Sequence, residues 1–160
     1  MEDKWNITAL VVSVLSVLLS LYALRQATTK NTSDMYLFFI SQYAKEDMKL
    51  ALRKLKDIKR GVYRLEQWES DMKNNLPKAF EYDEARRLVK YFYDTLAYMK
   101  LEKLIEARFV RLICLKKGAW LYLDTVEAME KFFDSGYDKK PYAVIRDVCE
   151  NLRKEGCCPP

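Results

Sequence analysis

The longest uncharged apolar run of the chain extends from Ile7 to Leu24, close to the N-terminus. As an α-helix this run would be about 27 Å long, which is enough to cross the hydrocarbon core of a bilayer once. Trp5 and Tyr22 stand near its ends, where aromatic side chains favour the membrane interface. The pattern predicts a transmembrane helix over residues 7–24, after a short flank over residues 1–6 and before a polar linker over residues 25–33.

A cleaved signal peptide is the other interpretation of this run. The flank Glu2, Asp3 and Lys4 lacks the positive charge that begins a signal peptide, and no clean small-x-small cleavage motif precedes Arg25. We therefore expect an anchor that is not cleaved.

The small residues of the predicted anchor form one stripe, because their spacings alternate between four and three residues. Membrane helices gain mainly from close backbone packing and occasional hydrogen bonds, and both favour Ala and Ser at the contact. This spacing averages a heptad, which keeps one seam facing a partner helix. The other interpretation is a passive anchor whose serine hydroxyls bond the backbone one turn earlier. We predict association, with a second copy or with another membrane protein, through Ala9, Ser13, Ser16, Ser20, Ala23 and Ala27.

Beyond the linker, apolar positions recur with the period of amphipathic helices. The clearest such helix lies between Lys45 and Gly61. Its apolar face consists of Met48, Ala51, Leu52, Leu55, Ile58 and Val62. A longer helix is expected over Tyr82 to Leu101, after a loop that Pro77 closes.

The C-terminal part shows the same pattern. Basic residues and a glycine at Lys116 to Gly118 predict the end of one helix. The next helix continues from Trp120 with a polar side that includes Asp124, Glu127 and Glu130. The last helix is expected to open near Pro141.

No segment alternates convincingly between apolar and polar residues in the manner of a strand, and the chain has only four glycines. The sequence therefore predicts an all-α protein. Residues 34–156 are expected to form a compact bundle of five or six helices, followed by a tail over residues 157–160.

The distribution of Lys and Arg around the predicted anchor sets its orientation. Lys4 stands alone before it, whereas Arg25, Lys30 and Lys45 follow it, so we expect a single-pass protein of the cell membrane with a cytoplasmic C-terminal domain. The cysteines agree with a reducing compartment, because two lie in apolar helical patterns and two are adjacent near the C-terminus. They are Cys114, Cys149, Cys157 and Cys158.

Composition excludes several chemistries. The chain contains no histidine, so the commonest general base and the usual transition-metal ligand are both missing. Its glycines are too far apart to build a phosphate-binding loop. Each pair of neighbouring carboxylates has Lys or Arg nearby, which is typical of a solvated helix face. We therefore predict no catalytic, cofactor-binding or metal-binding residues; the pairs are Asp83 and Glu84, Glu102 and Glu106, and Asp124 and Glu127.

Charge is concentrated rather than spread along the chain. Residues 45–64 hold eight Lys or Arg against three acids, a local charge of +5 that equals the charge of the whole chain. Residues 124–138 hold five acids and one lysine. A basic stripe near a membrane would meet anionic headgroups, each basic side chain contributing about 1 kcal/mol. The predicted membrane-surface residues are Lys45, Lys49, Arg53, Lys56 and Arg60. The other interpretation of this stripe is an ordinary solvated helix face.

A family resemblance agrees with this organisation. The N-terminal anchor, the segment "YDEARRLVKYFYDTLAYMKLEKLIEARFVRLICLKKGAWLYLDTVEAMEKFF" and the later "PYAVIRDVCENL" resemble domain of unknown function 4760, a group of small membrane-anchored helical proteins. The resemblance covers most of the chain and implies a similar fold and topology. The family has no established activity, so the resemblance implies no catalytic residues.

These observations predict a membrane-tethered, non-enzymatic interaction or regulatory module that associates through its transmembrane helix. Two alternatives stay open. The first is an enzyme whose carboxylate metal site is assembled from distant residues. The second is a nucleic-acid binder that uses the basic helix, although no recognition motif accompanies that helix.

Overall fold

The computed structural model describes residues 16–23, 26, 33–133 and 137–157. By contacts within the chain it divides into two units, Met1–Leu37 and Phe38–Pro160. All regular secondary structure in the described residues is helical, which confirms the all-α class.

The described part of the first unit is short. Residues 16–23 are helical and their side chains are exposed. Among the residues that the structure describes, no helix is long and apolar enough to cross a membrane. The predicted transmembrane helix over residues 7–24 extends beyond them, since residues 7–15 and residue 24 lie outside the described ranges.

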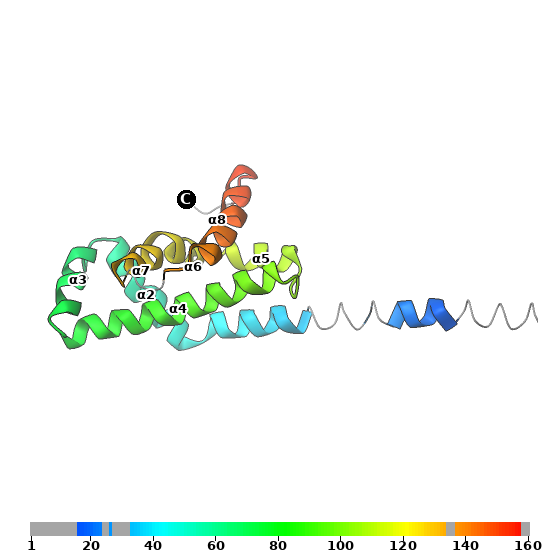
Figure 1. Ribbon diagram of the computed structural model, residues 1–160, viewed down its shortest axis with the longest axis horizontal. Coiled ribbons are helices and arrows are strands. Elements are labelled where there is room, and N and C mark those ends of the chain that lie inside the picture. The colour runs from blue at the N-terminus through cyan, green and yellow to red at the C-terminus, as the bar shows by residue number, and fades with distance from the viewer. Residues whose placement is uncertain (1–15, 24–25, 27–32, 134–136, 158–160) are drawn as a thin grey trace, which may run out of the picture. The chain divides into compact units, whose positions relative to one another are not determined.

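The second unit is a bundle arranged along one long helix. A helix over residues 33–44 enters this unit at Phe38, a bend follows at Lys45, and α2 begins at the next residue. α4 packs against α2, α3, α8 and the π-helical segment η1, and Figure 1 shows α3 and α5 at opposite ends of α4. The elements are α2 (Glu46–Lys59), α3 (Leu65–Lys73), α4 (Pro77–Leu101), α5 (Ala107–Cys114), α6 (Lys117–Leu121), η1 (Tyr122–Val126), α7 (Glu127–Phe133) and α8 (Lys139–Lys154).

Local chemistry explains where the helices begin and end. α4 starts at Pro77, earlier than the sequence predicted, because the fixed φ of proline suits the first helical position. The Asp138 carboxylate accepts a hydrogen bond of 2.9 Å from the Lys140 amide and caps α8. Gly61 and Gly156 follow α2 and α8 with φ of +73° and +71°, a conformation that glycine adopts without strain.

The helical run from α6 through α7 corrects one sequence prediction. Glu127 and Glu130 were expected on a polar, solvated side, but each is only 7% exposed. The π-helical turn at η1 is wider than an α-helical turn, so the residues after it no longer follow the α-helical period. Asp124, inside the turn, remains exposed as expected.

Tyrosines form much of the core. The ring centroids of Tyr93 and Tyr122 are 5.1 Å apart, and those of Tyr122 and Tyr142 are 4.5 Å apart and nearly parallel. The Tyr122 hydroxyl donates a hydrogen bond of 2.5 Å to Asp94. Burial, and for Tyr122 the hydrogen bond to Asp94, raises the pKa of Tyr122 and of Tyr142 above the usual value. These rings fill the space between α4, η1 and α8.

A buried ion-pair network joins α4 to α7. Arg86, 7% exposed, donates a hydrogen bond of 2.7 Å to Asp83 and pairs with Glu130. Its guanidinium also lies 4.7 Å from the centroid of the Phe133 ring. Each buried carboxylate thus has a cation beside it, as burial of charge requires.

We predict that Arg86→Met lowers the free energy of unfolding by about 3–5 kcal/mol, because it removes the buried cation between Asp83 and Glu130 and leaves them only the more exposed Arg87 and Lys90. Urea unfolding followed by circular dichroism measures the change. The matched control is Arg108→Met, which removes an exposed pair with Glu106 and should cost less than about 1 kcal/mol. Equal losses in the two variants would contradict the description of the Arg86 network as buried.

Candidate functional site

A basic pocket opens between the C-terminal part of the 33–44 helix, α2, α6 and α8. Its volume is 720 Å³, within the range of small-ligand sites. The described residues that line it include seven Lys or Arg and no Asp or Glu. The basic pocket consists of Tyr43, Lys49, Leu52, Arg53, Lys56, Lys59, Arg60, Lys117, Gly118, Trp120, Leu121 and Arg153.

The helical period of α2 brings most of the basic residues of the pocket to one side of the helix. Basic residues three or four positions apart share one side of the helix, while its apolar side packs toward α4. Lys49, Arg53, Lys56 and Arg60, all predicted from the sequence, line the pocket. Lys45, predicted with them, is exposed and does not line it, because the helix begins only after Lys45.

Two cations come from distant parts of the chain. Lys117 opens α6 and Arg153 lies in the last turn of α8, and the fold brings both to the side of α2. Sequence reasoning missed them, because Lys117 was interpreted as the end of a helix and Arg153 was assigned no role. No local signal connects either residue to α2, so only tertiary structure reveals the pocket.

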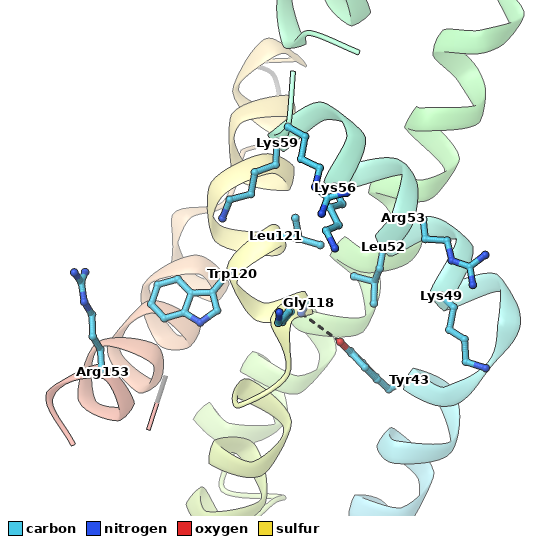
Figure 2. Close-up of a pocket in the computed structure, with 12 residues that line it drawn as sticks. Tyr43, Lys49, Leu52, Arg53, Lys56, Lys59, Gly118, Trp120, Leu121 and Arg153 are labelled. Atoms are coloured by element: carbon cyan, nitrogen blue, oxygen red, sulfur yellow. Dashed lines mark hydrogen bonds between the residues drawn. The ribbon is translucent and has the colours of Figure 1, made fainter. Parts of the chain in front are cut away.

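The floor of the pocket is apolar and aromatic. Leu52 and Trp120 are half-buried and Leu121 is buried. Figure 2 shows Lys56 and Lys59 on one side of this floor and Arg153 on the other. The Trp120 Nε1 atom is itself buried and has no hydrogen-bond partner among the described residues. The pocket therefore has an apolar floor and basic side chains around it.

Most of these cations lack a carboxylate. Lys49 pairs with Glu46 at 3.3 Å and Lys59 pairs with Asp124 at 2.5 Å, in both cases with an acid that does not line the pocket. No salt bridge within the described ranges involves the other five, which are all exposed to solvent. They are Arg53, Lys56, Arg60, Lys117 and Arg153.

Gly118 fixes the wall between Tyr43 and α6. Its amide donates a hydrogen bond of 3.2 Å to the Tyr43 hydroxyl. A Cβ at this position would lie 2.8 Å from the Tyr93 hydroxyl and 2.9 Å from the Tyr43 hydroxyl, so no larger side chain fits. Burial raises the pKa of Tyr43, and raises the pKa of Tyr93 further. Gly118 is thus an interior residue of α6 and not the helix-ending cap that the sequence suggested.

Four of the six carboxylates in the predicted pairs form salt bridges within the described part of the chain: Asp83, Glu106, Asp124 and Glu127. Glu127 pairs with Arg146 and lies 3.6 Å from the Lys131 Nζ. Burial and a hydrogen bond to Glu127 raise the pKa of Tyr137 to about 12. Asp83 is buried whereas its predicted partner Glu84 is exposed, so these two do not form a pair. In the residues that the structure describes, no group of three His, Cys, Asp or Glu side chains could hold a metal ion.

No disulfide bond joins the cysteines that the structure describes. Cys114 and Cys149 are buried and in contact, and the hydrogen bond between them raises the pKa of Cys114 above its usual range. Cys157 is exposed, and Cys158 lies outside the described ranges.

The predicted association stripe is described only in part. Ser16, Ser20 and Ala23 are helical and exposed, while Ala9, Ser13 and Ala27 lie outside the described residues. The Ser20 hydroxyl donates a hydrogen bond of 2.8 Å to the Ser16 carbonyl oxygen, which is the backbone bond expected of a passive anchor.

Comparison with known proteins returns no relatives. No protein-family model matches the chain, and no curated protein or solved structure matches it. The resemblance to domain of unknown function 4760 therefore stays a prediction.

We predict that Gly118→Ala lowers the free energy of unfolding by about 1–3 kcal/mol, because the added methyl group overlaps two tyrosine hydroxyls. Adding Tyr43→Phe removes one of these hydroxyls and should recover part of the loss. The coupling between the two substitutions is read from a double-mutant cycle in urea. If the changes in unfolding free energy of the two substitutions simply add, the methyl group at position 118 and the Tyr43 hydroxyl are not in contact.

Proposed function

We propose that this protein is a membrane-tethered, non-enzymatic binding module that holds the phosphate of an anionic membrane lipid in the basic pocket. The observation that carries the proposal is a pocket of 720 Å³ with seven basic side chains and no acidic one in its described lining. The anchor over residues 7–24, the cytoplasmic position of the bundle and the association of anchors form part of this proposal.

Charge supports a phosphate ligand. Five cations from three helices have no salt-bridge partner in the described part of the chain, and a phosphate oxygen accepts strong hydrogen bonds from both Lys and Arg. Arg53, Arg60 and Arg153 offer planar guanidinium groups, which match phosphate with two parallel hydrogen bonds. Anion binding would therefore remove repulsion that the free pocket contains.

Lipid is favoured over nucleic acid by the form of the site. A nucleic-acid surface is an extended track of charge with stacked aromatic residues. This pocket is a single concave site, and Trp120 and Tyr43 are its only aromatic lining among the described residues. Binding of tRNA as tight as lipid binding at the same salt concentration would favour the nucleic-acid alternative.

We predict that the variant Arg53→Gln, Lys56→Gln, Arg60→Gln binds anionic lipid about 100-fold more weakly than the wild type, since three cations contribute about 1 kcal/mol each. The full chain is purified in neutral detergent, phosphatidylglycerol is titrated into the micelles, and the rise in Tm gives the affinity. Binding of the wild type should weaken as salt screens the charges.

A charge-matched control separates the pocket from overall charge. Arg64→Gln, Lys103→Gln, Lys139→Gln also removes three positive charges, but none of these residues lines the pocket. This control should keep the wild-type affinity. If both triple variants weaken binding equally, the pocket has no special role and the basic residues act only as a diffuse surface.

We predict that the anchors associate through their small-residue stripe. In a background without the native cysteines, single cysteines at Ser13, Ser16 and Ser20 should form more disulfide dimers in membranes than cysteines at Val11, Leu15 and Leu18. Small residues would let the backbones approach at the first set only. Equal or absent crosslinking at both sets would contradict self-association through the stripe. The Ser20 hydroxyl would then have only its bond to the backbone of its own helix.

A further inference from the structure

We infer that the basic pocket selects a phosphomonoester lipid, phosphatidic acid, whose bare phosphate lies among the cations and whose glycerol lies on the apolar floor. This inference rests on the proposed function and names the lipid. Three features of the pocket carry it: the missing carboxylates, the number of unpaired cations and the apolar floor.

The missing carboxylates exclude headgroups that contain an amine. Serine and ethanolamine headgroups bring an ammonium group, which needs an anionic or carbonyl partner inside the site. The described lining contains no acid, and the two carboxylates that contact its cations, Glu46 and Asp124, already pair with Lys49 and Lys59. An ammonium group here would face like charge, which opposes binding.

The number of cations favours a doubly charged phosphate. A phosphodiester carries one negative charge, whereas a phosphomonoester approaches two at neutral pH, since its second pKa is about 6. Arg53, Lys56 and Arg60 reach the site from α2, Lys117 from α6 and Arg153 from α8. Cations on three helices line the pocket, and a terminal phosphate offers them three free oxygens, whereas a diester offers only two.

The apolar floor favours a lipid over a soluble phosphate. Leu52, Trp120 and Leu121 form a surface that a free phosphate would leave in contact with water. A glycerol backbone with the first carbons of its acyl chains would cover this surface and gain from apolar contact. Figure 2 shows Leu121 and Trp120 between the lysines of α2, Lys56 and Lys59, and Arg153 of α8.

The charge of the phosphate should make the affinity for the lipid depend on pH. The charged groups that face the bound phosphate are the five basic side chains of α2, Lys117 of α6 and Arg153 of α8, with the Tyr43 hydroxyl beside them. The chain has no histidine, so no side chain of the usual neutral-range type titrates in this site. A rise in affinity between pH 5.5 and 7.5 would therefore report the second ionisation of the phosphate.

The test uses the full chain in neutral detergent with dioleoyl lipids titrated into the micelles and affinity read from Tm. At pH 7.5, phosphatidic acid should bind about ten-fold more tightly than phosphatidylglycerol, the equivalent of one further charge-assisted hydrogen bond. Phosphatidylserine should bind more weakly than phosphatidylglycerol. At pH 5.5 the preference for phosphatidic acid should shrink, while phosphatidylglycerol binding should stay constant.

Variants of the pocket cations on α6 and α8 test whether the preference for phosphatidic acid over phosphatidylglycerol arises in this pocket. Lys117→Gln with Arg153→Gln should reduce phosphatidic acid binding more than phosphatidylglycerol binding. Lys103→Gln with Lys139→Gln, outside the pocket, should leave the preference unchanged. Soluble glycerol 3-phosphate, inorganic pyrophosphate and ATP serve as competitors, and none should displace the lipid at equal concentration.

The outcomes separate the two proposals. If phosphatidylserine binds as tightly as phosphatidic acid, or if the preference does not depend on pH, the selectivity is overturned while the lipid-binding function stands. If ATP or pyrophosphate displaces the lipid at equal concentration, the ligand is a soluble phosphate and the lipid assignment is overturned. If no anionic ligand depends on the pocket, the proposed function itself fails.

Discussion

The close approach of three helices at Gly118 is the constraint on which the pocket depends. The Tyr43 hydroxyl from the 33–44 helix and the Tyr93 hydroxyl from α4 both occupy space that a side chain at this position would need. With no side chain there, α6 lies against both and its amide bonds Tyr43. The floor residues Trp120 and Leu121 follow directly in α6, so their position relative to α2 is set by this contact.

Charged side chains occur in two different environments in this protein. Around Arg86 and Glu127, buried or half-buried charges meet opposite charges from α4, α7 and α8, and little net field remains. Around the pocket, five cations stay without carboxylates in the described structure and remain in contact with water. The first arrangement serves stability, since removing either partner leaves a costly buried charge. The second sacrifices some stability through repulsion and creates a field that attracts anions.

Periodicity made the fold class and one wall of the pocket predictable. The spacing of Lys49, Arg53, Lys56 and Arg60 is a property of one helix, so the sequence alone places these residues on one side of it. The contribution of Lys117 and Arg153 depends on how α6 and α8 pack, which no local pattern encodes. Val62 shows the limit at a helix end, because it was expected in the core but is 72% exposed, beyond the end of α2. Periodicity describes a face only as long as the helix continues.

The π-helical turn at η1 sets which side of α7 faces α4. A π-helical turn holds about one residue more than an α-helical turn, so Tyr122–Val126 turn through nearly the same angle as about four α-helical residues. If all of these residues were α-helical instead, α7 would be rotated by about 100°. Glu130 would then turn away from Arg86, and the buried network would lose its carboxylate from α7. Loss of one residue together with the π-helical turn would keep the phase of α7, so homologous chains can shorten this segment by one residue and still retain the pair between Arg86 and Glu130.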